Sequence, residues 1–533
     1  MRLLPNSPQD FAFVSAWANL LLPFLALWAQ RLAAKIRAGT RAPTRWWRRA
    51  PTVLLLLLAV GTTTSYVGRN NRAHPHGVQG YDTFHYYPGA KYRAELGTEL
   101  LYFCALVADL ELDHPRFNEV KRYRDLKTYR VLSKKKRRIR ADKSRCKDRF
   151  TPERWTEFKK DIRYFQKITS SRTWRRVFID RGTNASPVWH LFGGSVARLV
   201  PTSHLSWATQ LDWVMLAIAL GFIAWAFGLD VAAVAMIFFT ASVPTRWPHI
   251  GAVLFRYDWV AALAIAISLI KKDRWAWAGA AIAYAAGVRL FPIIIIGGLG
   301  GRALWRIATE RRLLRSEWRL LFGFFTATAL FWTAAAIDGG LPAIQEFAAK
   351  ISTHTAPENV SVMRVGLQIA LAFEGELSSA KYQGYKVLTR KRKIIKEQAP
   401  WHRVFVLLLI LLVIAISRRL DDDEALLMGF AMFPLVLQAS YYYYAFALVP
   451  FVLHAVNLAR RPHYFLFAFL CLLNAFGHFA LGNKVTRYVI LAPGSVLVVI
   501  YCACCLALLA WTSHARHRRG LADLGRVTDP GER

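Results

Sequence analysis

The chain has 533 residues, of which 54% are hydrophobic, and 71 Lys and Arg against 34 Asp and Glu give a formal net charge of +37. Soluble proteins rarely combine so much apolar sequence with so much charge, so the two must be segregated along the chain. Residues 53–60 and 404–416 contain no ionisable side chain, whereas residues 121–149 are about half Lys and Arg. This segregation excludes an ordinary soluble protein and predicts one that crosses a membrane several times.

The N-terminal segment, residues 1–50, contains an apolar stretch at residues 11–30 and a basic stretch at residues 31–49. Pro23 interrupts the apolar stretch, which is either a thirteenth span or a helix in the membrane interface. We expect the interfacial helix. A cleaved signal peptide is disfavoured, because its charged region would precede the apolar stretch.

Hydropathy predicts an all-α polytopic membrane protein with about 12 to 13 transmembrane or re-entrant helices and one helical extracytoplasmic insertion. Several apolar runs fall short of the roughly 20 residues that a perpendicular helix needs, so the sequence sets their boundaries only loosely. The expected spans are residues 51–67, 206–227, 230–245, 255–270, 317–337, 403–417, 424–438, 442–458, 463–481 and 487–511.

Short basic connectors orient these spans. If the spans alternate in direction, all of the connectors fall on one side, which their excess of Lys and Arg identifies as cytoplasmic. The connectors are residues 31–49, 271–274, 302–319, 418–419, 460–461 and 516–519. The chain then divides into extracytoplasmic loops at 68–205 and 338–402, membrane segments at 51–67, 206–337 and 403–511, and a basic cytoplasmic tail at 512–533. The first loop is itself very basic, but long loops cross membranes largely regardless of charge.

The first outward loop contains the sequence YDTFHYY at residues 81–87. In a helix, a spacing of three places Asp82 and His85 on one face, where both reach a common ligand flanked by Tyr81 and Tyr86. The alternative is an aspartate that caps a short interfacial helix, with the aromatic residues anchored among the lipid headgroups. The local pattern leaves both interpretations open.

Residues 95–111 combine four carboxylates with an apolar face and predict an amphipathic helix that lies on the membrane. Asp109 is the carboxylate closest to an apolar run, which makes it the second candidate after Asp82. Of the six cysteines, only Cys104 and Cys146 can meet in an aqueous loop, so a disulfide between them is one option.

The basic insertion, residues 121–181, interleaves Lys and Arg with tyrosine and tryptophan. Such a pattern is typical of nucleic-acid binding, but lipid phosphates are the better anionic partner outside a membrane, and a solvated charged face is as plausible. We therefore expect membrane lipids and no nucleic acid as partners. Helical spacing of apolar residues within 151–176 predicts a folded helical insert.

Residues 275–301 are apolar but broken by Gly287, Arg289 and Pro292. The break predicts two half-length helices that form a re-entrant hairpin with Arg289 at its tip. A guanidinium matches phosphate in geometry, and a broken helix leaves N–H groups free to assist. Arg289 is therefore the expected phosphate-binding residue.

Ionisable residues near membrane depth are costly and so indicate function. Arg256 and Asp258 are two of them, and they either belong to a site or neutralise each other at the interface. The tyrosine run at residues 441–444 is able to stack on a sugar, but we expect an aromatic belt at the headgroups. The second outward loop adds three residues that are either ligand contacts or loop surface: Lys350, His354 and Asn359.

Three motifs together resemble the GT-C superfamily of integral membrane glycosyltransferases: YDTFHYY at residues 81–87, FRYDW at residues 255–259 and VRLFP at residues 288–292. The branch that this chain resembles most contains the polyprenol-phosphate-mannose-dependent mannosyltransferases. The resemblance covers most of the chain, but the basic insertion at residues 121–181 matches no motif of the superfamily.

The resemblance implies a GT-C-like bundle that moves a hexose from a polyprenyl-phosphate sugar to a glycolipid or polysaccharide acceptor. It implies an active site on the outer face of a bacterial cytoplasmic membrane, with no metal or other cofactor. By this resemblance Asp82 is the general base, and His85 and Asp109 orient the acceptor or the phosphate. Arg289 and Arg256 stabilise the leaving phosphate, so Arg289→Ala is expected to weaken donor binding much more than Arg181→Ala.

Two other classes of function compete with this interpretation. A transporter or lipid flippase also uses many spans, a broken hairpin and buried charge, but the sequence contains no evident inverted repeat. A scaffold that binds anionic surface polymer through the basic insertion would leave Asp82 and Arg289 unexplained.

Overall fold

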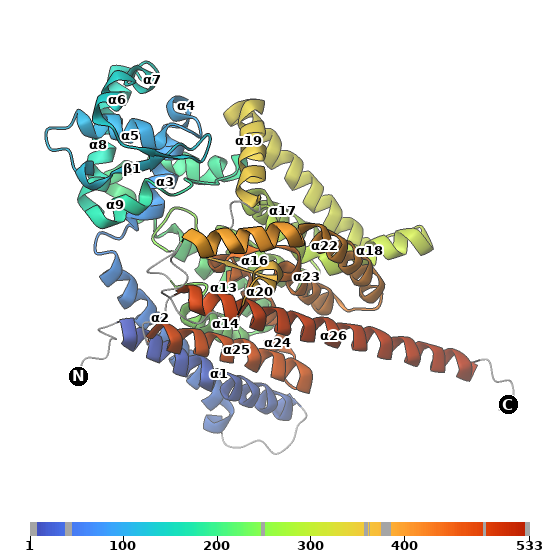
Figure 1. The fold of residues 1–533 in the computed structure, drawn as a ribbon. Coiled ribbons are helices and arrows are strands. Elements are labelled where there is room, and N and C mark those ends of the chain that lie inside the picture. The colour runs from blue at the N-terminus through green and yellow to red at the C-terminus, as the bar shows by residue number, and fades with distance from the viewer. Residues whose placement is uncertain are drawn as a thin grey trace.

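The computed structural model describes residues 8–37, 45–246, 251–356, 361, 363–374, 385–482 and 487–527, and nearly all of its regular structure is helical (Figure 1). Within these residues, eight helical segments are long and apolar enough to cross a membrane. The chain is therefore a polytopic, all-α membrane protein. The eight segments are Asp10–Ile36, Arg49–Ala73, Thr202–Phe227, Phe291–Glu310, Arg315–Thr355, Thr389–Ser417, Arg461–Ala480 and Ala492–Arg518.

The apolar helices form one bundle, to which both ends of the chain contribute. Its first helices are α1 (Pro8–Arg37), α2 (Arg45–Ala73), α13 (Leu211–Phe227), α14 (Leu229–Ala241), α16 (Asp258–Lys271), α17 (Trp275–Arg289), η4 (Phe291–Ile296), α18 (Gly297–Glu310) and α19 (Arg315–Thr355). The later ones are α22 (Tyr385–Ser417), α23 (Asp422–Val436), η6 (Tyr441–Ala447), α24 (Leu448–Val456), α25 (Arg461–Gly482) and α26 (Arg487–Val527). Between α19 and α22 lie strand β3 (Arg364–Val365), which pairs antiparallel with β4 (Ala439–Ser440), and helix α20 (Leu367–Leu371).

Every expected span coincides with a helix of the bundle. However, α14, α16 and α23 have only 13, 14 and 15 residues, which is shorter than the roughly 20 that a perpendicular crossing needs. The number of complete crossings, about 12 to 13 by hydropathy, therefore stays a prediction.

Helix α1 belongs to the bundle. It has 30 residues and packs lengthwise against α25, α2 and α14, and Pro23 does not interrupt it. Asn19 near its middle is fully buried and donates from its side chain to the carbonyl of Ala241 at 2.8 Å. Length and packing favour the spanning alternative over the interfacial helix that we expected.

The break within residues 275–301 is present, but the hairpin is not. Leu290 has a left-handed backbone conformation (φ 47°) and separates α17 from η4, which begins just before Pro292. Helix α17 packs against α16 and α19, whereas α18 packs against α22 and α23. The expected re-entrant hairpin is thus wrong, because each half finds its partners in other helices.

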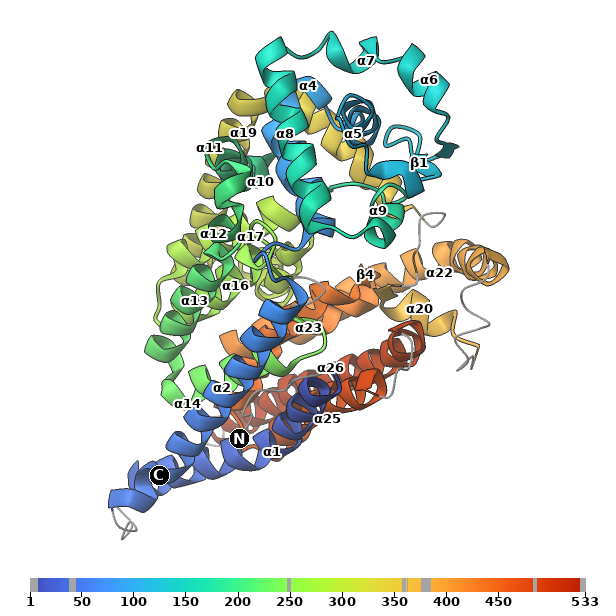
Figure 2. The same cartoon turned by 90° about the vertical axis from the view of Figure 1, so that its left-hand side faces the viewer.

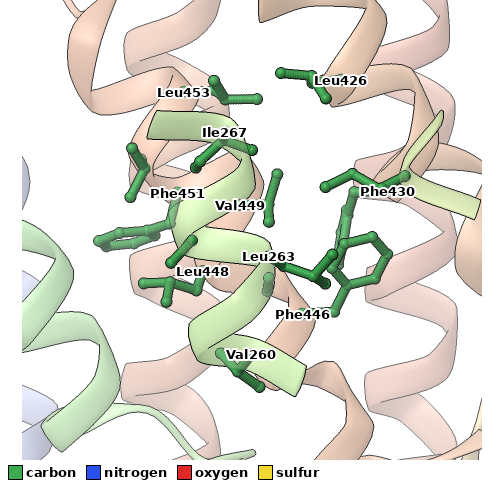
Figure 3. Packing of buried hydrophobic residues seen from close by; sticks show 14 of the residues in the cluster. Val260, Leu263, Ile267, Leu426, Phe430, Phe446, Leu448, Val449, Phe451 and Leu453 are labelled. Carbon is green, nitrogen blue, oxygen red and sulfur yellow. The ribbon is translucent and has the colours of Figure 1, made fainter. Parts of the chain in front are cut away.

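Helix α16 lies in the apolar core of the bundle. Figure 3 shows its side chains Val260, Leu263 and Ile267 packed against residues of α23, η6 and α24. All residues of α16 from Asp258 to Ile267 except Ile265 are buried, so protein covers this part of the helix on all sides. A short helix can be stable at this depth because its neighbours, not lipid, surround it.

Several basic connectors lie together at one end of the bundle. Lys271 at the end of α16 pairs with Asp423 at the start of α23, with Nζ and Oδ2 3.2 Å apart. Arg516 of α26 pairs with Asp421, in the connector just before α23, at 2.6 Å. The connectors before α17 and α23 and the C-terminal segment therefore share one side, as their charge predicted.

A separate helical domain, the insertion domain, covers residues 80–199. It consists of α3 (Gly80–Lys91), α4 (Arg93–Leu96), α5 (Leu101–Leu110), η1 (Phe117–Glu119), α6 (Lys136–Ala141), α7 (Ser144–Lys147), α8 (Pro152–Ile168), α9 (Ser171–Val177), α10 (Pro187–Trp189), η2 (His190–Gly194) and α11 (Ser195–Leu199), with a hairpin of β1 (Arg122–Arg124) and β2 (Val131–Ser133). The short helices η3 (Thr202–His204) and α12 (Leu205–Ala208) connect it to α13. In Figure 2 the domain lies at the top, while α1, α25 and α26 lie far below.

Helix α5 is the centre of the insertion domain. All of its residues from Leu101 to Asp109 are buried, and Cys104 forms a disulfide with Cys146 of α7. The expected amphipathic helix on the membrane is therefore wrong, because α8, α6 and β1 cover the face that would have met water. The disulfide, one option from the sequence, is present.

The folded insert expected around residues 151–176 is confirmed. Thr151 caps α8, and the Trp155, Phe158 and Ile162 side chains of this helix are buried in the core of the insertion domain. Helix α8 places this apolar face against α5 and α3. The basic residues of the insertion thus surround an apolar core of their own.

Candidate functional site

Helix α3 holds the proposed catalytic carboxylate in its first turn. Gln79 caps this helix, since its side-chain oxygen accepts the backbone N–H of Asp82 at 2.7 Å. The alternative in which Asp82 is itself the cap is therefore wrong. The Asp82 side chain is 21% exposed and points its carboxylate toward the bundle.

Arg256 is the cationic partner of Asp82. Its Nη2 donates to Oδ2 of Asp82 at 2.8 Å, and its side chain is only 7% exposed. The backbone N–H of Arg256 donates to the Asp212 carboxylate of α13 at 3.0 Å, which fixes the loop before α16. The guanidinium lies over the ring of Tyr442, 4.7 Å from its centroid. One arginine thus joins the insertion domain, α13 and η6.

Asp258 takes a different direction from Arg256. Its carboxylate accepts the backbone N–H of Trp259 at 2.8 Å and the hydroxyl of Tyr284 on α17 at 3.1 Å. Mutual neutralisation of Arg256 and Asp258 is therefore wrong. Asp258 is the first residue of α16, while Arg256 precedes the helix, so the two side chains do not share a helix face.

Arg289 lies near this site without lining it. Its guanidinium carbon is 5.6 Å from the ring centroid of Tyr86, and that of Arg256 is 5.9 Å from the same ring. Arg289 is 9% exposed, and no ion pair joins it to a carboxylate among the described residues. Because the helix pair is not a hairpin, Arg289 is at the end of α17 and not at an exposed tip. Arg256 is thus the arginine of this pair that faces Asp82.

His85 is on the same face of α3 as Asp82, as their spacing predicted. Its Nε2 is 2.6 Å from the hydroxyl of Tyr102 on α5, and its ring contacts that of Tyr81 edge to face. The Tyr81 hydroxyl donates to Oδ2 of Asp180 at 2.8 Å. Burial, together with the charge of Asp180, raises the pKa of Tyr81 well above its ordinary value, so its phenol stays protonated. These bonds fix the orientation of the His85 ring.

A cavity of about 860 Å³, the central cavity, opens between the insertion domain and the bundle. Asp82, His85 and Arg256 lie in its wall together with Tyr81 and Tyr86. The insertion domain supplies a second wall through β1, α9 and the loop after α9. A volume of this size falls in the usual range for small-molecule sites.

The tyrosine run of residues 441–444 belongs to the site. Tyr441, Tyr442 and Tyr443 line the central cavity, and Tyr444 is buried and donates to the carbonyl of Val365 at 3.0 Å. The expected aromatic belt at the headgroups is therefore wrong. The run forms η6, a tight helix pinned by the β3–β4 pair, so its rings turn into the protein.

The four remaining candidates do not lie together. His354 lines the central cavity, whereas Lys350 lines a small cavity with Arg93 under the insertion domain. Asp109 is fully buried and accepts the backbone N–H of Arg116 at 2.8 Å and the amide of Gln166, so its role is structural. Its expected part in orienting substrate is wrong. Asn359 lies outside the described residues.

Sequence reasoning missed several residues of the cavity wall. Asp180, Arg124 and Arg176 line it. Arg181, whose substitution was expected to affect donor binding much less than that of Arg289, lines it too. All four come from the basic insertion, whose charge was visible in the sequence but whose fold was not. Gln79, the residue that caps α3, was recognisable as a polar residue just before the helix.

The fold and the site together define a polytopic helical membrane protein with a polar, arginine-containing cavity beside its bundle. No group of three or more histidine, cysteine, aspartate or glutamate side chains within the described residues is arranged to hold a metal ion. Comparison of the chain with known protein families, characterised proteins and solved structures finds no match. The functional assignment therefore depends on the geometry of the cavity.

Proposed function

We propose that this protein is a membrane glycosyltransferase of the GT-C type that moves a hexose, such as mannose, from a polyprenyl-phosphate donor to a glycolipid or polysaccharide. The observation that carries the proposal is the Asp82–Arg256 ion pair in the wall of a cavity of about 860 Å³ at the edge of an apolar bundle. One side chain is suited to remove a proton and the other to bind a phosphate.

The proposed reaction needs two complementary groups. The carboxylate of Asp82 takes the proton of the acceptor hydroxyl while that oxygen attacks the anomeric carbon of the donor sugar. The bond between the anomeric carbon and the phosphate oxygen breaks, and the polyprenyl phosphate leaves with the electron pair. Arg256 stabilises its negative charge. Attack opposite the leaving group inverts the anomeric configuration.

Binding of the donor would change the state of Asp82. A phosphate competes with the carboxylate for the Arg256 guanidinium, because each of the two anions can accept two N–H groups of the guanidinium at once. Once Arg256 has turned to the phosphate, Asp82 is released for the acceptor. The ring of Tyr442 holds the guanidinium in reach of both partners.

An apolar pocket next to the central cavity suits the lipid part of the donor. It is lined by apolar residues of α14, α23, α25 and α26, and Tyr441 borders both this pocket and the central cavity. Its space of about 80 Å³ accommodates only the start of a polyprenyl chain. The rest of the chain would lie in the bilayer.

We further propose that the site faces the outside of a bacterial cytoplasmic membrane, with about 12 to 13 helices embedded in a GT-C-like arrangement. Helix α16 starts at Asp258 beside the cavity and ends at Lys271 among the basic connectors, so the cavity and these connectors lie at opposite ends of that helix. The positive-inside rule makes the connector end cytoplasmic. The Cys104–Cys146 disulfide supports an oxidising compartment for the insertion domain.

The proposal is tested by supplying the purified protein with a panel of radiolabelled polyprenyl-phosphate sugars and membrane extract as the acceptor. Transfer of label from at least one donor to extracted glycolipid or polysaccharide supports it. If correctly folded protein transfers no sugar but moves a labelled lipid-linked sugar across vesicle membranes, the protein is a flippase instead.

A further inference from the structure

The wall of the central cavity that the insertion domain supplies is rich in arginine. Arg124 at the end of β1, Arg176 on α9 and Arg181 after α9 all line it. Arg256, in the wall formed by the bundle, is a fourth arginine that lines the cavity. The carboxylates that line the cavity are Asp82 and Asp180. The cavity therefore carries an excess of positive charge.

Two of the arginines on the insertion-domain wall, Arg124 and Arg176, have no carboxylate partner within the described residues. Arg124 is held in place by backbone carbonyls, with its Nε donating to that of Ile179 at 2.9 Å. Neither Arg124 nor Arg176 forms an ion pair with a carboxylate of the described chain. Asp180, the acid on this wall, accepts the hydroxyl of Tyr81. Burial and the repulsion of Arg124, Arg364 and Arg392 lower the pKa of Arg181 to about 10.

Like charges grouped around a cavity repel one another and disfavour folding, and a bound anion would offset this repulsion. The donor phosphate of the proposed reaction has Arg256 in the opposite domain as its partner. A second set of arginines, on a different wall, therefore indicates a second anion. In a transfer reaction the second substrate is the acceptor.

The other groups on this wall suit a saccharide. Thr169, Ser170 and Asn184 bring hydroxyl and amide groups to the cavity surface, and Tyr81 brings an aromatic ring. Hydrogen-bonding groups of this kind match sugar hydroxyls, whereas a lipid tail requires an apolar wall such as that of the pocket beside Tyr441. Guanidinium groups pair with carboxylates or phosphates.

We infer that the acceptor of the proposed reaction is an anionic saccharide, carrying uronate or phosphate groups, which the wall formed by Arg124, Arg176 and Arg181 binds. This inference rests on the proposed function only in making the bound saccharide the acceptor. Binding of the saccharide itself does not require sugar transfer. The basic insertion thus acts as the acceptor-recognition part of the protein.

Binding is measured with the full chain in phosphatidylcholine nanodiscs, using a galacturonate pentasaccharide and neutral maltopentaose as probes. We expect the acidic probe to bind more tightly, and its affinity to fall with added salt. Arg176→Glu is expected to weaken its binding by about tenfold or more, as for the loss of one charge-assisted contact. The matched control is Arg172→Glu, an exposed arginine on the same helix that does not line the cavity.

Arg181→Gln and Arg181→Lys give a second comparison, in which lysine retains binding better than glutamine. Equal affinity for the two saccharides, or equal loss in Arg176→Glu and Arg172→Glu, would overturn the inference. So would an Arg176→Glu effect on binding to phosphatidylglycerol vesicles with none on the saccharide, because the arginine would then contact lipid.

The inference and the proposed function fail in different ways. If the acidic saccharide binds through Arg176 but no donor supports transfer, the site stands and the enzyme assignment falls. If transfer occurs to neutral acceptors and is unchanged in Arg176→Glu, the enzyme assignment stands and the anionic acceptor is rejected.

Discussion

The guanidinium of Arg256 and the carboxylate of Asp82, 174 residues apart in the chain, form an ion pair of 2.8 Å in the wall of the central cavity. Asp82 comes from the insertion domain and Arg256 from the loop before α16, so the pair joins the two parts of the protein. On the proposed function, a donor phosphate that captures Arg256 also releases Asp82. Donor binding and the availability of the base are then coupled.

We expect Asp82→Asn to lower kcat for sugar transfer by roughly 10²- to 10⁴-fold, because an amide cannot accept the proton of the acceptor hydroxyl. Transfer from the active donor to membrane extract measures the change. Asp148→Asn is the control, since Asp148 is an exposed aspartate of the same domain outside the cavity. Full activity in a folded Asp82→Asn protein would exclude this residue as the base.

Arg256→Gln is expected to weaken donor binding by about tenfold, because one charge-assisted contact to the phosphate is lost. Arg289→Gln should weaken it less, since Arg289 does not line the cavity. Displacement of a radiolabelled polyprenyl-phosphate sugar measures both affinities. A larger effect of Arg289→Gln would place the phosphate site at the break between α17 and η4. Arg181 is unsuitable as the control for this experiment because it lines the cavity.

Local patterns in the sequence predicted local structure well. The apolar spacing of Trp155, Phe158 and Ile162 predicted the buried face of α8, and each apolar run assigned as a span coincides with a helix of the bundle. The spacing of Asp82 and His85 also placed both side chains on the cavity. Each of these features depends on residues within a few turns of one helix.

Features that depend on distant parts of the chain were missed. No local pattern indicates that Arg256 meets Asp82 instead of its neighbour Asp258, since the pairing depends on how the insertion domain sits on the bundle. Helix α5 was misassigned for a similar reason: its acids lie mostly outside the helix, and other segments cover its remaining face. The tyrosine run near residue 442 was assigned to the membrane surface because its composition fits a belt and its fold was unknown.

The Cys104–Cys146 disulfide should contribute substantially to the stability of the insertion domain. It closes a loop of 42 residues, for which chain entropy gives about 4 kcal/mol of stabilisation. We expect the double variant Cys104→Ser/Cys146→Ser to unfold at lower urea concentration and to be cleaved faster by protease within the domain. Cys504→Ser, at an exposed free cysteine, is the control. Unchanged urea and protease resistance in the double variant would show that the domain does not depend on this bond.

Lys91 and Asp161 form a buried ion pair that fastens α3, and with it Asp82, to α8. Their Nζ and Oδ2 atoms are 2.8 Å apart with both side chains at most 5% exposed, and Tyr92 donates its hydroxyl to the same carboxylate oxygen at 2.8 Å.

Asp161→Ala removes the buried partner of Lys91, which keeps only the half-exposed Glu157 at 2.7 Å among the described residues, and it leaves the Tyr92 hydroxyl without its acceptor. It should therefore lower the free energy of unfolding by about 3–5 kcal/mol. Urea unfolding measures the loss, with Asp148→Ala as the exposed control. Because part of the cost comes from an ammonium that has lost its buried partner, adding Lys91→Met to Asp161→Ala should restore part of the lost stability. If Asp161→Ala/Lys91→Met is less stable than Asp161→Ala alone, Lys91 is held by its packing and its contact with Glu157. The Lys91–Asp161 pair is then not what fastens α3 to α8.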